Sequence, residues 1–371
     1  MLTELTVTNF RNLKDVSLEN LGRITLIAGR NGVGKTALLE ALWLLSGPDN
    51  PELGARMNAF RGLPITSPDT VFRDLFRNFD TGEDIKVSAR GNWGRQRREL
   101  EISLKDRKQL PAILSGSLEK ASIERSTRPQ AEGGFELVFK YRHQDGNEYV
   151  SRAWWYQEMP APVGIGPIEV ASEGIRGERQ AVEGRPDSVL MASLHRDDLQ
   201  TVASRFGELQ LKGKDDEILR LLRSLEPRLK RLVPITIRNT TVIHANIAGT
   251  DRPIPIQLLG EGLNRMFNLA LAMGTATGGL LLIDEIENGL HHTVLSEVFV
   301  TLLAMARTFN VQVFATTHSA ECIRAAHKAL KEADQHEAAF YRLQRTNGEI
   351  KAVGFDREML ETAIFHEMEV R

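Results

Sequence analysis

The stretch Gly29–Thr36, with the sequence GRNGVGKT, constrains the fold of this chain more than any other feature. The apolar run Ile24–Ala28 precedes it and the apolar run Ala37–Leu45 follows it, as a strand and a helix would. The spacing Gly-x-x-x-x-Gly-Lys-Thr is that of a P-loop, whose backbone N–H groups bind phosphate oxygens at a helix N-terminus. We predict that Lys35 reaches the β- and γ-phosphates of a nucleotide and that the Thr36 hydroxyl binds Mg²⁺. A chance match in a glycine-rich turn would not need the flanking strand and helix.

The glycines of this stretch allow the backbone to bend closely around phosphates, because a Cβ at Gly29 or Gly34 would stand in the way. The residues of the turn that we expect to surround the nucleotide phosphates are Arg30, Asn31, Gly32, Val33, Gly34, Lys35, Thr36 and Ala37.

Composition sets limits on the class of protein. The chain has 371 residues, of which 42% are hydrophobic and 26% charged, as in an ordinary globular protein of one large or two moderate domains. A net charge of −2 gives no global attraction for nucleic acid, so such a contact would need a local basic patch. The single cysteine, Cys322, allows no intramolecular disulfide. We expect a cytoplasmic protein with no membrane contact, because the chain has neither a signal-peptide pattern nor a membrane-spanning apolar stretch.

Two further strands are predicted to end in chemically active side chains. The apolar run Leu280–Ile283 is followed by Asp284, which we expect to bind Mg²⁺, and by Glu285, which we expect to polarise a water for attack on the γ-phosphate. The run Val311–Ala315 leads to His318, which is placed to hydrogen-bond the γ-phosphate. Standing alone, His318 would more often be a core or helix-capping residue.

A second glycine turn, Gly260-Glu261-Gly262, precedes an apolar helical pattern. Glycines at the start of a helix again describe an anion-binding site. Because the P-loop already serves the nucleotide of this chain, we expect the second turn to serve the nucleotide of a neighbouring subunit.

The middle of the chain predicts antiparallel strands. The segments 85–90 and 99–104 alternate as one hairpin, and the segments 135–141 and 148–156 alternate as another. A P-loop implies a parallel sheet, so we expect these hairpins to form a separate layer.

Other segments carry weaker signals. We expect an irregular loop over 48–70, a short packed helix over 71–79, irregular structure over 106–134 and a long loop over 157–188. An apolar helical face over 217–232, interrupted near Pro227, predicts a helix. A solvated face explains its basic residues better than a phosphate-contacting patch does; these are Arg220, Arg223, Arg228, Lys230 and Arg231.

Taken together, these motifs occur in the order found in ABC-type ATPase heads, and their details resemble the SMC/RecF/OLD branch. Asn9–Asn12 (NFRN) resembles the opening of that branch, and Leu259–Gly262 (LGEG) its degenerate signature. Asp284–His291 (DEIENGLH) resembles the D-E-x-E-x-x-L-H stretch of OLD-like ATPases, and Thr316–Ser319 (TTHS) resembles their switch. The resemblance covers residues 1–47 and about 255–325 with specific motifs.

This resemblance implies an α/β fold, in which an ABC-type P-loop NTPase head has a mainly parallel core sheet, an antiparallel β layer and a helical insertion. It divides the chain into an N-terminal ATPase lobe (1–105), a middle region with the β-hairpin, flexible loops and the helical insertion (106–232), and a C-terminal ATPase lobe (233–371). It implies that Arg11 and Asn12 lie near the phosphates.

The same resemblance implies ATP and Mg²⁺ as cofactors and a second copy of the chain as partner. ATP would be sandwiched between two heads, each P-loop facing the partner's Gly260–Gly262 turn. The chain departs from the family pattern at two positions, since Gly260 replaces the usual signature Ser and Glu261 adds a carboxylate near the expected γ-phosphate. These departures predict slow or conditional hydrolysis.

The function predicted from the resemblance is ATP hydrolysis by a sensor or regulatory subunit in anti-phage defence or DNA maintenance. The chain is similar in this respect to the ATPase subunit of PARIS-like systems. Only 53 residues follow His318 (371 − 318), too few for the nuclease domain of full OLD proteins, so we expect a separate effector such as a nuclease.

The alternative is a RecF-like repair clamp that binds DNA directly, so DNA is a further candidate partner. The ATPase subunit of a transporter ranks last. It would need a Ser-Gly-Gly signature and a coupling Gln, and no Gln occurs between the P-loop and Gln96.

Overall fold

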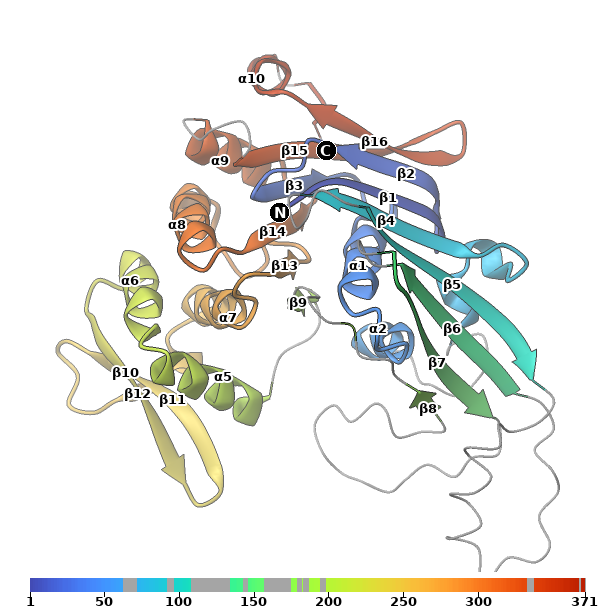
Figure 1. The fold of residues 1–371 in the computed structure, drawn as a ribbon. Coiled ribbons are helices and arrows are strands. Elements are labelled where there is room, and N and C mark those ends of the chain that lie inside the picture. Colours follow the sequence, from blue (N-terminus) through green and yellow to red (C-terminus); the bar gives the residue numbers. More distant parts are fainter. Residues whose placement is uncertain are drawn as a thin grey trace, which may run out of the picture.

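A six-stranded sheet carries the P-loop stretch at the end of its strand β3 (Figure 1). In the computed structural model the described residues are 1–62, 72–91, 97–107, 134–142, 146–156, 175–178, 182, 187–193, 198–331, 337–366 and 368–370. The strand order is β16-β15-β3-β14-β13-β9, and every neighbouring pair is parallel except β15 with β16. These strands are β3 (Ile24–Ala28), β9 (Ser188–Met191), β13 (Leu280–Ile283), β14 (Gln312–Thr317), β15 (Ala338–Thr346) and β16 (Glu349–Phe355). The prediction of a mainly parallel core sheet is confirmed.

Side chains of the central strands alternate between two hydrophobic cores. On β13, Leu281 and Ile283 belong to the core that includes residues of helices α7 (Glu261–Thr275), α8 (Leu295–Thr308) and α9 (Ala320–Leu330). Leu280 and Leu282 belong to the core around helix α1 (Lys35–Ser46). Both faces of the sheet are therefore covered, which explains why these strands read as continuous apolar runs in the sequence.

An antiparallel sheet of seven strands forms a second layer, and α1 lies between it and the core sheet (Figure 1). Its strand order is β2-β1-β4-β5-β6-β7-β8. These strands are β1 (Leu2–Phe10), β2 (Leu13–Glu19), β4 (Ile85–Gly91), β5 (Arg98–Arg107), β6 (Gly134–Arg142), β7 (Glu148–Tyr156) and β8 (Ile175–Glu178). Both predicted hairpins and their separate layer are confirmed. The loop prediction over 157–188 is wrong at β8, which is stabilised by pairing with β7.

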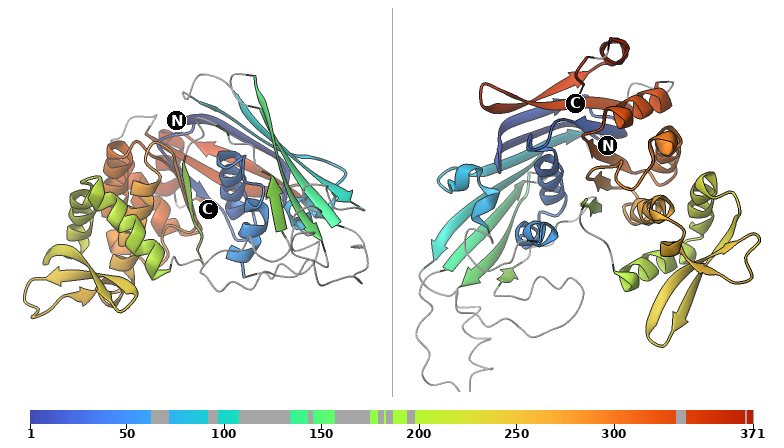
Figure 2. Two further views of the ribbon diagram at one scale, coloured as in Figure 1. Left: turned by 60° about the horizontal axis from the view of Figure 1, so that its bottom comes forward. Right: turned by 180° about the vertical axis from the view of Figure 1, so that it is seen from behind.

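A third unit projects from the α7 side of the molecule, as Figure 2 shows from two further directions. It contains α5 (Leu199–Leu211), α6 (Asp215–Leu225) and a sheet in the order β10-β11-β12, with bounds Leu229–Ile237, Thr240–Ile247 and Ile254–Pro255. The predicted helix over 217–232 is wrong beyond Leu225. Proline cannot continue a helix, so the chain turns at Pro227, and Leu229 and Leu232 lie on β10.

The segment after α1 also differs from the sequence prediction. A helix, α2 (Leu53–Phe60), lies within the expected loop 48–70, because Leu53, Ala55 and Met57 bury their side chains. Two 3₁₀ turns, η1 (Arg73–Leu75) and η2 (Arg77–Phe79), replace the helix expected over 71–79.

The remaining regular elements are η4 (Ile256–Leu258), η5 (His292–Val294) and α10 (Arg357–Phe365). The predictions over 108–133 and 157–174 lie outside the described residues. No helix in the described part of the chain is both long and apolar enough to span a membrane.

Candidate functional site

The P-loop turn has the backbone that its glycines were expected to supply. Gly29, Gly32 and Gly34 have φ values of 154°, 78° and 85°, which other residues rarely adopt. A Cβ at Gly34 would lie 2.6 Å from Leu13 Cδ2 and 2.9 Å from the side-chain oxygen of Asn12. The Asn12 amide itself donates to the Gly32 carbonyl at 3.1 Å. Asn12, which lies between β1 and β2, therefore stabilises the P-loop turn.

Lys35 lies inside this turn. Its ammonium donates to the carbonyls of Gly29 at 2.7 Å and Arg30 at 3.0 Å, and its side chain is buried. Burial lowers the pKa of Lys35, while the negative charges of Asp284 and Glu285 act in the opposite direction. The sequence therefore places a cation where the P-loop pattern predicts phosphate oxygens.

Thr36 and Asp284 meet across the ends of α1 and β13. The Thr36 hydroxyl is 3.1 Å from both carboxylate oxygens of Asp284. Octahedral Mg²⁺ with ligand distances near 2.1 Å separates neighbouring ligand oxygens by about 2.9 Å, so this spacing suits two ligands of one ion. The donor set is also suitable, because both groups are hard oxygen ligands. The described residues contain no group of three or more His, Cys, Asp or Glu side chains that could hold a metal by themselves, so nucleotide phosphates and water would complete such a site.

Glu285 has an unusual backbone conformation with φ of 50°. For a residue other than glycine, this left-handed conformation costs roughly 1–2 kcal/mol. Two hydrogen bonds hold it, since the Glu285 N–H donates to Thr316 Oγ1 at 2.9 Å and the Asn288 side chain donates to Glu285 Oε2 at 2.7 Å. Thr316 also donates to Asp284 Oδ1 at 2.7 Å. One hydroxyl at the end of β14 thus orients both carboxylate residues.

His318 lies beside two carboxylates. Its ring Nδ1 is 3.6 Å from Glu285 Oε1 and 3.3 Å from Glu287 Oε1. Glu287 also accepts hydrogen bonds from the Thr317 hydroxyl at 2.8 Å and the His318 N–H at 3.0 Å. Glu287 is the second glutamate of the D-E-x-E stretch, but no role was predicted for it from the sequence.

The second glycine turn packs on the loop that follows Glu285. Gly260 precedes the first residue of α7 and has φ of 100°. A Cβ at Gly262 would lie 3.4 Å from the Gly289 carbonyl, and one at Gly289 would lie 2.9 Å from Glu261 Cγ. From the next turn of α7, Arg265 donates to the Asp284 carbonyl at 3.3 Å. Arg265 was not predicted from the sequence. Burial lowers the pKa of Arg265, while the negative charge of Asp284 acts in the opposite direction.

Arg11 takes part in a buried charge cluster beside α1. Its Nε is 2.8 Å from Glu40 Oε2, and its other nitrogens are 3.1 Å from Asp74 Oδ2 and 3.2 Å from Asn58 Oδ1. Arg61 donates to both Glu40 oxygens at 3.0 Å. Burial lowers the pKa of Arg11 and raises the pKa of Glu40. In this conformation the guanidinium is held by side chains, and its approach to a phosphate stays a prediction.

The remaining predicted residues are distributed around the turn. Asn31 is exposed, and Arg30 is exposed with its guanidinium 3.3 Å from Glu369. Val33 and Ala37 are buried in the core around α1. The described structure therefore brings together the turn, Lys35, Thr36, Asp284, Glu285 and His318, and it places Gly260–Gly262 on the neighbouring loop.

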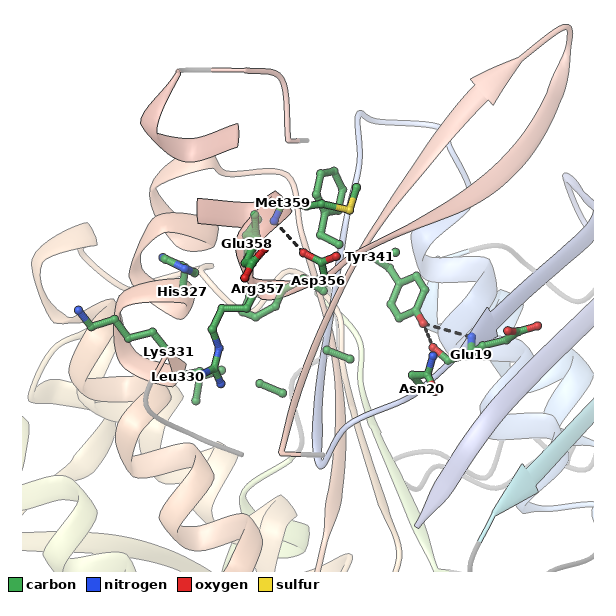
Figure 3. A pocket seen from close by; sticks show the side chains of 16 residues that line it. Glu19, Asn20, His327, Leu330, Lys331, Tyr341, Asp356, Arg357, Glu358 and Met359 are labelled. Atoms are coloured by element: carbon green, nitrogen blue, oxygen red, sulfur yellow. Dashed lines mark hydrogen bonds between the residues drawn. The ribbon is translucent and has the colours of Figure 1, made fainter. Parts of the chain in front are cut away.

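A separate cavity of about 1050 Å³ lies between α9, α10 and the β15–β16 hairpin (Figure 3). Its lining includes His327 from α9, Lys331 just after that helix, and Asp356 and Arg357 at the start of α10. None of the predicted site residues lines it, so this cavity is distinct from the P-loop site.

The chain is similar in sequence to several known proteins. The family described as "AAA domain, putative AbiEii toxin, Type IV TA system" matches residues 24–324. An ATP/GTP phosphatase of Helicobacter pylori is 22% identical over 357 residues, which is 93% of each chain. An OLD nuclease of Thermus scotoductus is 40% identical over 89 residues, 24% of this chain and 14% of that protein.

Among solved structures, an SMC head bound to the C-winged helix domain of ScpA superposes with a TM-score of 0.50. The sequence identity is 15%, and the superposition covers 97% of this chain and 99% of that one. This likeness supports the fold alone. Because the family match covers most of the chain and includes the P-loop, the carboxylate pair and His318, the chain belongs to this family of AAA domains, and its fold is like that of an SMC head.

Proposed function

We propose that this ATPase hydrolyses ATP between Gly29–Thr36 and the Asp284–Glu285 pair, with Glu285 as general base and His318 as the γ-phosphate contact. The observation that carries the proposal is the meeting of Lys35, Thr36, Asp284 and Glu285 at the ends of neighbouring elements. Lys35 lies within the turn at 2.7 Å from the Gly29 carbonyl, and Thr36 lies 3.1 Å from Asp284.

The chemistry follows from which oxygens are already occupied. Asn288 donates to Glu285 Oε2, whereas Oε1 faces the imidazole of His318 at 3.6 Å. A water that bonds to Oε1 would give its proton to Glu285 as its oxygen attacks the γ-phosphorus and the bond to the β-phosphate oxygen breaks. Lys35 would balance negative charge on the transferred phosphoryl group. Thr36 and Asp284 would hold Mg²⁺, which would supply positive charge to neutralise the phosphates.

A second copy of the chain is proposed to complete the site. The Gly260–Gly262 turn packs on Gly289, but a Cβ at Gly260 would meet no described atom within 4 Å. Glu261 is exposed, and Leu258, just before the turn, is 74% exposed. An open helix N-terminus with an exposed apolar neighbour suits a surface that closes against the nucleotide of a partner.

The proposed biological role is a regulatory ATPase that acts with a separate effector in defence against phage or in DNA maintenance. The 89-residue match to an OLD nuclease and the toxin–antitoxin description of the family support this setting. Affinity purification from the native host, followed by mass spectrometry, should recover a nuclease or another toxic effector. Strong, salt-sensitive binding of gapped DNA by the isolated protein would instead favour the RecF-like clamp.

The catalytic assignment is tested with Glu285→Gln. We expect ATP binding to be retained and turnover to fall by at least about 100-fold, because the amide cannot take the proton. Sedimentation velocity should show an ATP-dependent dimer in this variant. Glu297→Gln, on the exposed side of α8, is the matched control and should hydrolyse ATP normally. Normal turnover by Glu285→Gln would remove Glu285 from the role of base.

Lys35→Ala separates binding from chemistry. The loss of the ammonium should abolish ATP binding, measured as the loss of the rise in melting temperature that saturating ATP causes in the wild-type protein. A variant that is still stabilised by ATP to the wild-type extent would contradict the placement of Lys35 at the phosphates.

A further inference from the structure

We infer that Glu287 is the positioning residue for His318, holding the imidazole by its Nδ1 so that its Nε2 is left for the γ-phosphate. The inference rests on the proposed function, because it assigns the residue that makes the His318 contact possible. Glu287 is the second glutamate of the D-E-x-E stretch, and its contacts, rather than that pattern, point to this role.

A single oxygen of Glu287 holds the whole segment at the end of β14. Glu287 Oε1 accepts from the Thr317 hydroxyl at 2.8 Å and from the His318 N–H at 3.0 Å, and it is 3.3 Å from His318 Nδ1. The first of these contacts fixes the Thr317 side chain, the second fixes the backbone of His318, and the third lies against its ring. The ring is thereby oriented before any nucleotide binds.

The position of the carboxylate also selects the form of the imidazole. A carboxylate oxygen only accepts hydrogen bonds, so a ring nitrogen that bonds to it must carry the hydrogen, and Nδ1 at 3.3 Å is the nitrogen placed to do so. In the neutral ring this places the hydrogen on Nδ1 and leaves Nε2 with a free lone pair. Metal-binding and catalytic histidines are oriented in the same way by a carboxylate on their second nitrogen.

The contacts of Glu287 are not needed to begin helix α9. Ser319 already caps that helix, because its hydroxyl accepts from the Cys322 N–H at 3.1 Å. The burial of Glu287 instead costs free energy. Its side chain is only 11% exposed, and its Oε2 is buried without a hydrogen-bond partner among the described residues. A carboxylate retained in such surroundings, beside the strand-end histidine, is better explained by its effect on that histidine than by capping.

The electrostatic surroundings connect Glu287 to the same site. Burial lowers the pKa of Lys35, and Glu287 is among the carboxylates that act against this change. Burial also lowers the pKa of Arg265 on α7, and Glu287 is again among the carboxylates that act against the change. Glu287 is therefore within electrostatic reach of both the P-loop cation and the helix that carries the second glycine turn.

The test is a double-mutant cycle with the full-length protein. Glu287→Ala should lower kcat for ATP by about 10- to 100-fold and leave KM within about 2-fold, because the ring is misplaced while the P-loop is intact. His318→Ala should lower kcat to a similar level. The double variant should show no further loss, since Glu287 acts through His318. Glu287→Gln keeps an acceptor oxygen of the same reach and should restore kcat to within about 3-fold of the wild type.

A second measurement is independent of turnover. The ¹⁵N shifts of the His318 ring, assigned by their loss in His318→Ala, should show the Nδ1–H form in the wild type and a mixture of forms in Glu287→Ala. Glu321→Ala, which removes an exposed carboxylate from the first turn of α9, is the control and should change neither kcat nor the ring signals.

The outcomes distinguish a failure of the proposed role of His318 from a failure of the positioning role of Glu287. If His318→Ala retains wild-type turnover, the proposed role of His318 fails and this inference fails with it. If His318→Ala loses turnover but Glu287→Ala does not, or if the double variant loses at least about 10-fold more than either single variant, only the positioning role of Glu287 is overturned. A Glu287→Ala variant that fails to fold leaves Glu287→Gln to decide, and loss of kcat by that folded variant would exclude positioning by an acceptor oxygen.

Discussion

Replacing Glu40 by alanine should be among the most destabilising single changes in this chain. The Glu40 carboxylate is 3% exposed and binds Arg11 Nε at 2.8 Å and two nitrogens of Arg61 at 3.0 Å. Glu40→Ala would leave Arg11, itself only 11% exposed, facing Asp74 as its remaining anion. Removing one partner of a buried ion pair costs about 3–5 kcal/mol, and Arg11 would keep only Asp74 to compensate its buried charge. We expect that decrease in the free energy of unfolding.

Two comparison variants distinguish a buried pair from a surface one. Arg61 is 39% exposed, so Arg61→Ala should cost at most about 1 kcal/mol, and Glu40 would keep Arg11. The double variant Arg11→Met with Glu40→Met removes both buried charges and should be less destabilised than the sum of its single changes. Urea unfolding followed by far-UV circular dichroism measures the loss of stability in each of these variants, including the two single Met variants. A decrease below about 1 kcal/mol for Glu40→Ala, or one equal to that for Arg61→Ala, would refute the argument that burial sets the magnitude.

Two further predictions concern the P-loop and the single cysteine. Gly34→Ala should weaken ATP binding by more than about 10-fold in calorimetry, since its Cβ would displace Leu13 and Asn12 and shift the turn. Gly278→Ala has a similar φ of 78° with open space around it, so it should lower stability without changing ATP affinity. Burial raises the pKa of Cys322 to about 12. We therefore expect iodoacetamide to modify Cys322 at pH 8 at least about 100-fold more slowly in the native protein than in urea, as followed by mass spectrometry. Rapid labelling of the native protein would show that the thiol is accessible.

The parts of the site that could be predicted are those whose geometry is local or follows from a parallel sheet. Gly29–Thr36 carries its own strand, turn and helix, so its structure is encoded in neighbouring residues. Asp284 and His318 come at or just beyond the ends of β13 and β14, which are parallel neighbours, and parallel strands deliver their carboxyl ends to one edge. These facts were available from the sequence because they require no knowledge of side-chain packing.

The residues that escaped prediction depend on long-range contacts. Glu40 sits on the core-facing side of α1 and looked like an ordinary helix residue. Its partner Arg61 lies in a segment without a clear pattern, and so does Asp74, the second anion beside Arg11. Arg265 is four residues into α7, where an arginine is unremarkable until the fold brings it to the Asp284 carbonyl. Leu229 and Leu232 fitted a helical face in the sequence, and pairing of β10 with β11 decided against it. No local propensity contains that information.

One short segment, Asp284–Leu290, explains how motifs so far apart in the chain form one site. Its first residues bind the Thr36 and Thr316 hydroxyls, Glu287 binds the segment that carries His318, and Gly289 contacts the second glycine turn. The left-handed conformations of Glu285 and Gly289 bend the segment so that these contacts point in different directions. The insertion of α5, α6 and β10–β12 enters the chain before α7 and projects away from this segment (Figure 2). We therefore expect its length and content to vary without moving the carboxylates, because the side chains that contact Asp284 and Glu285, those of Thr36, Thr316 and Asn288, lie outside it.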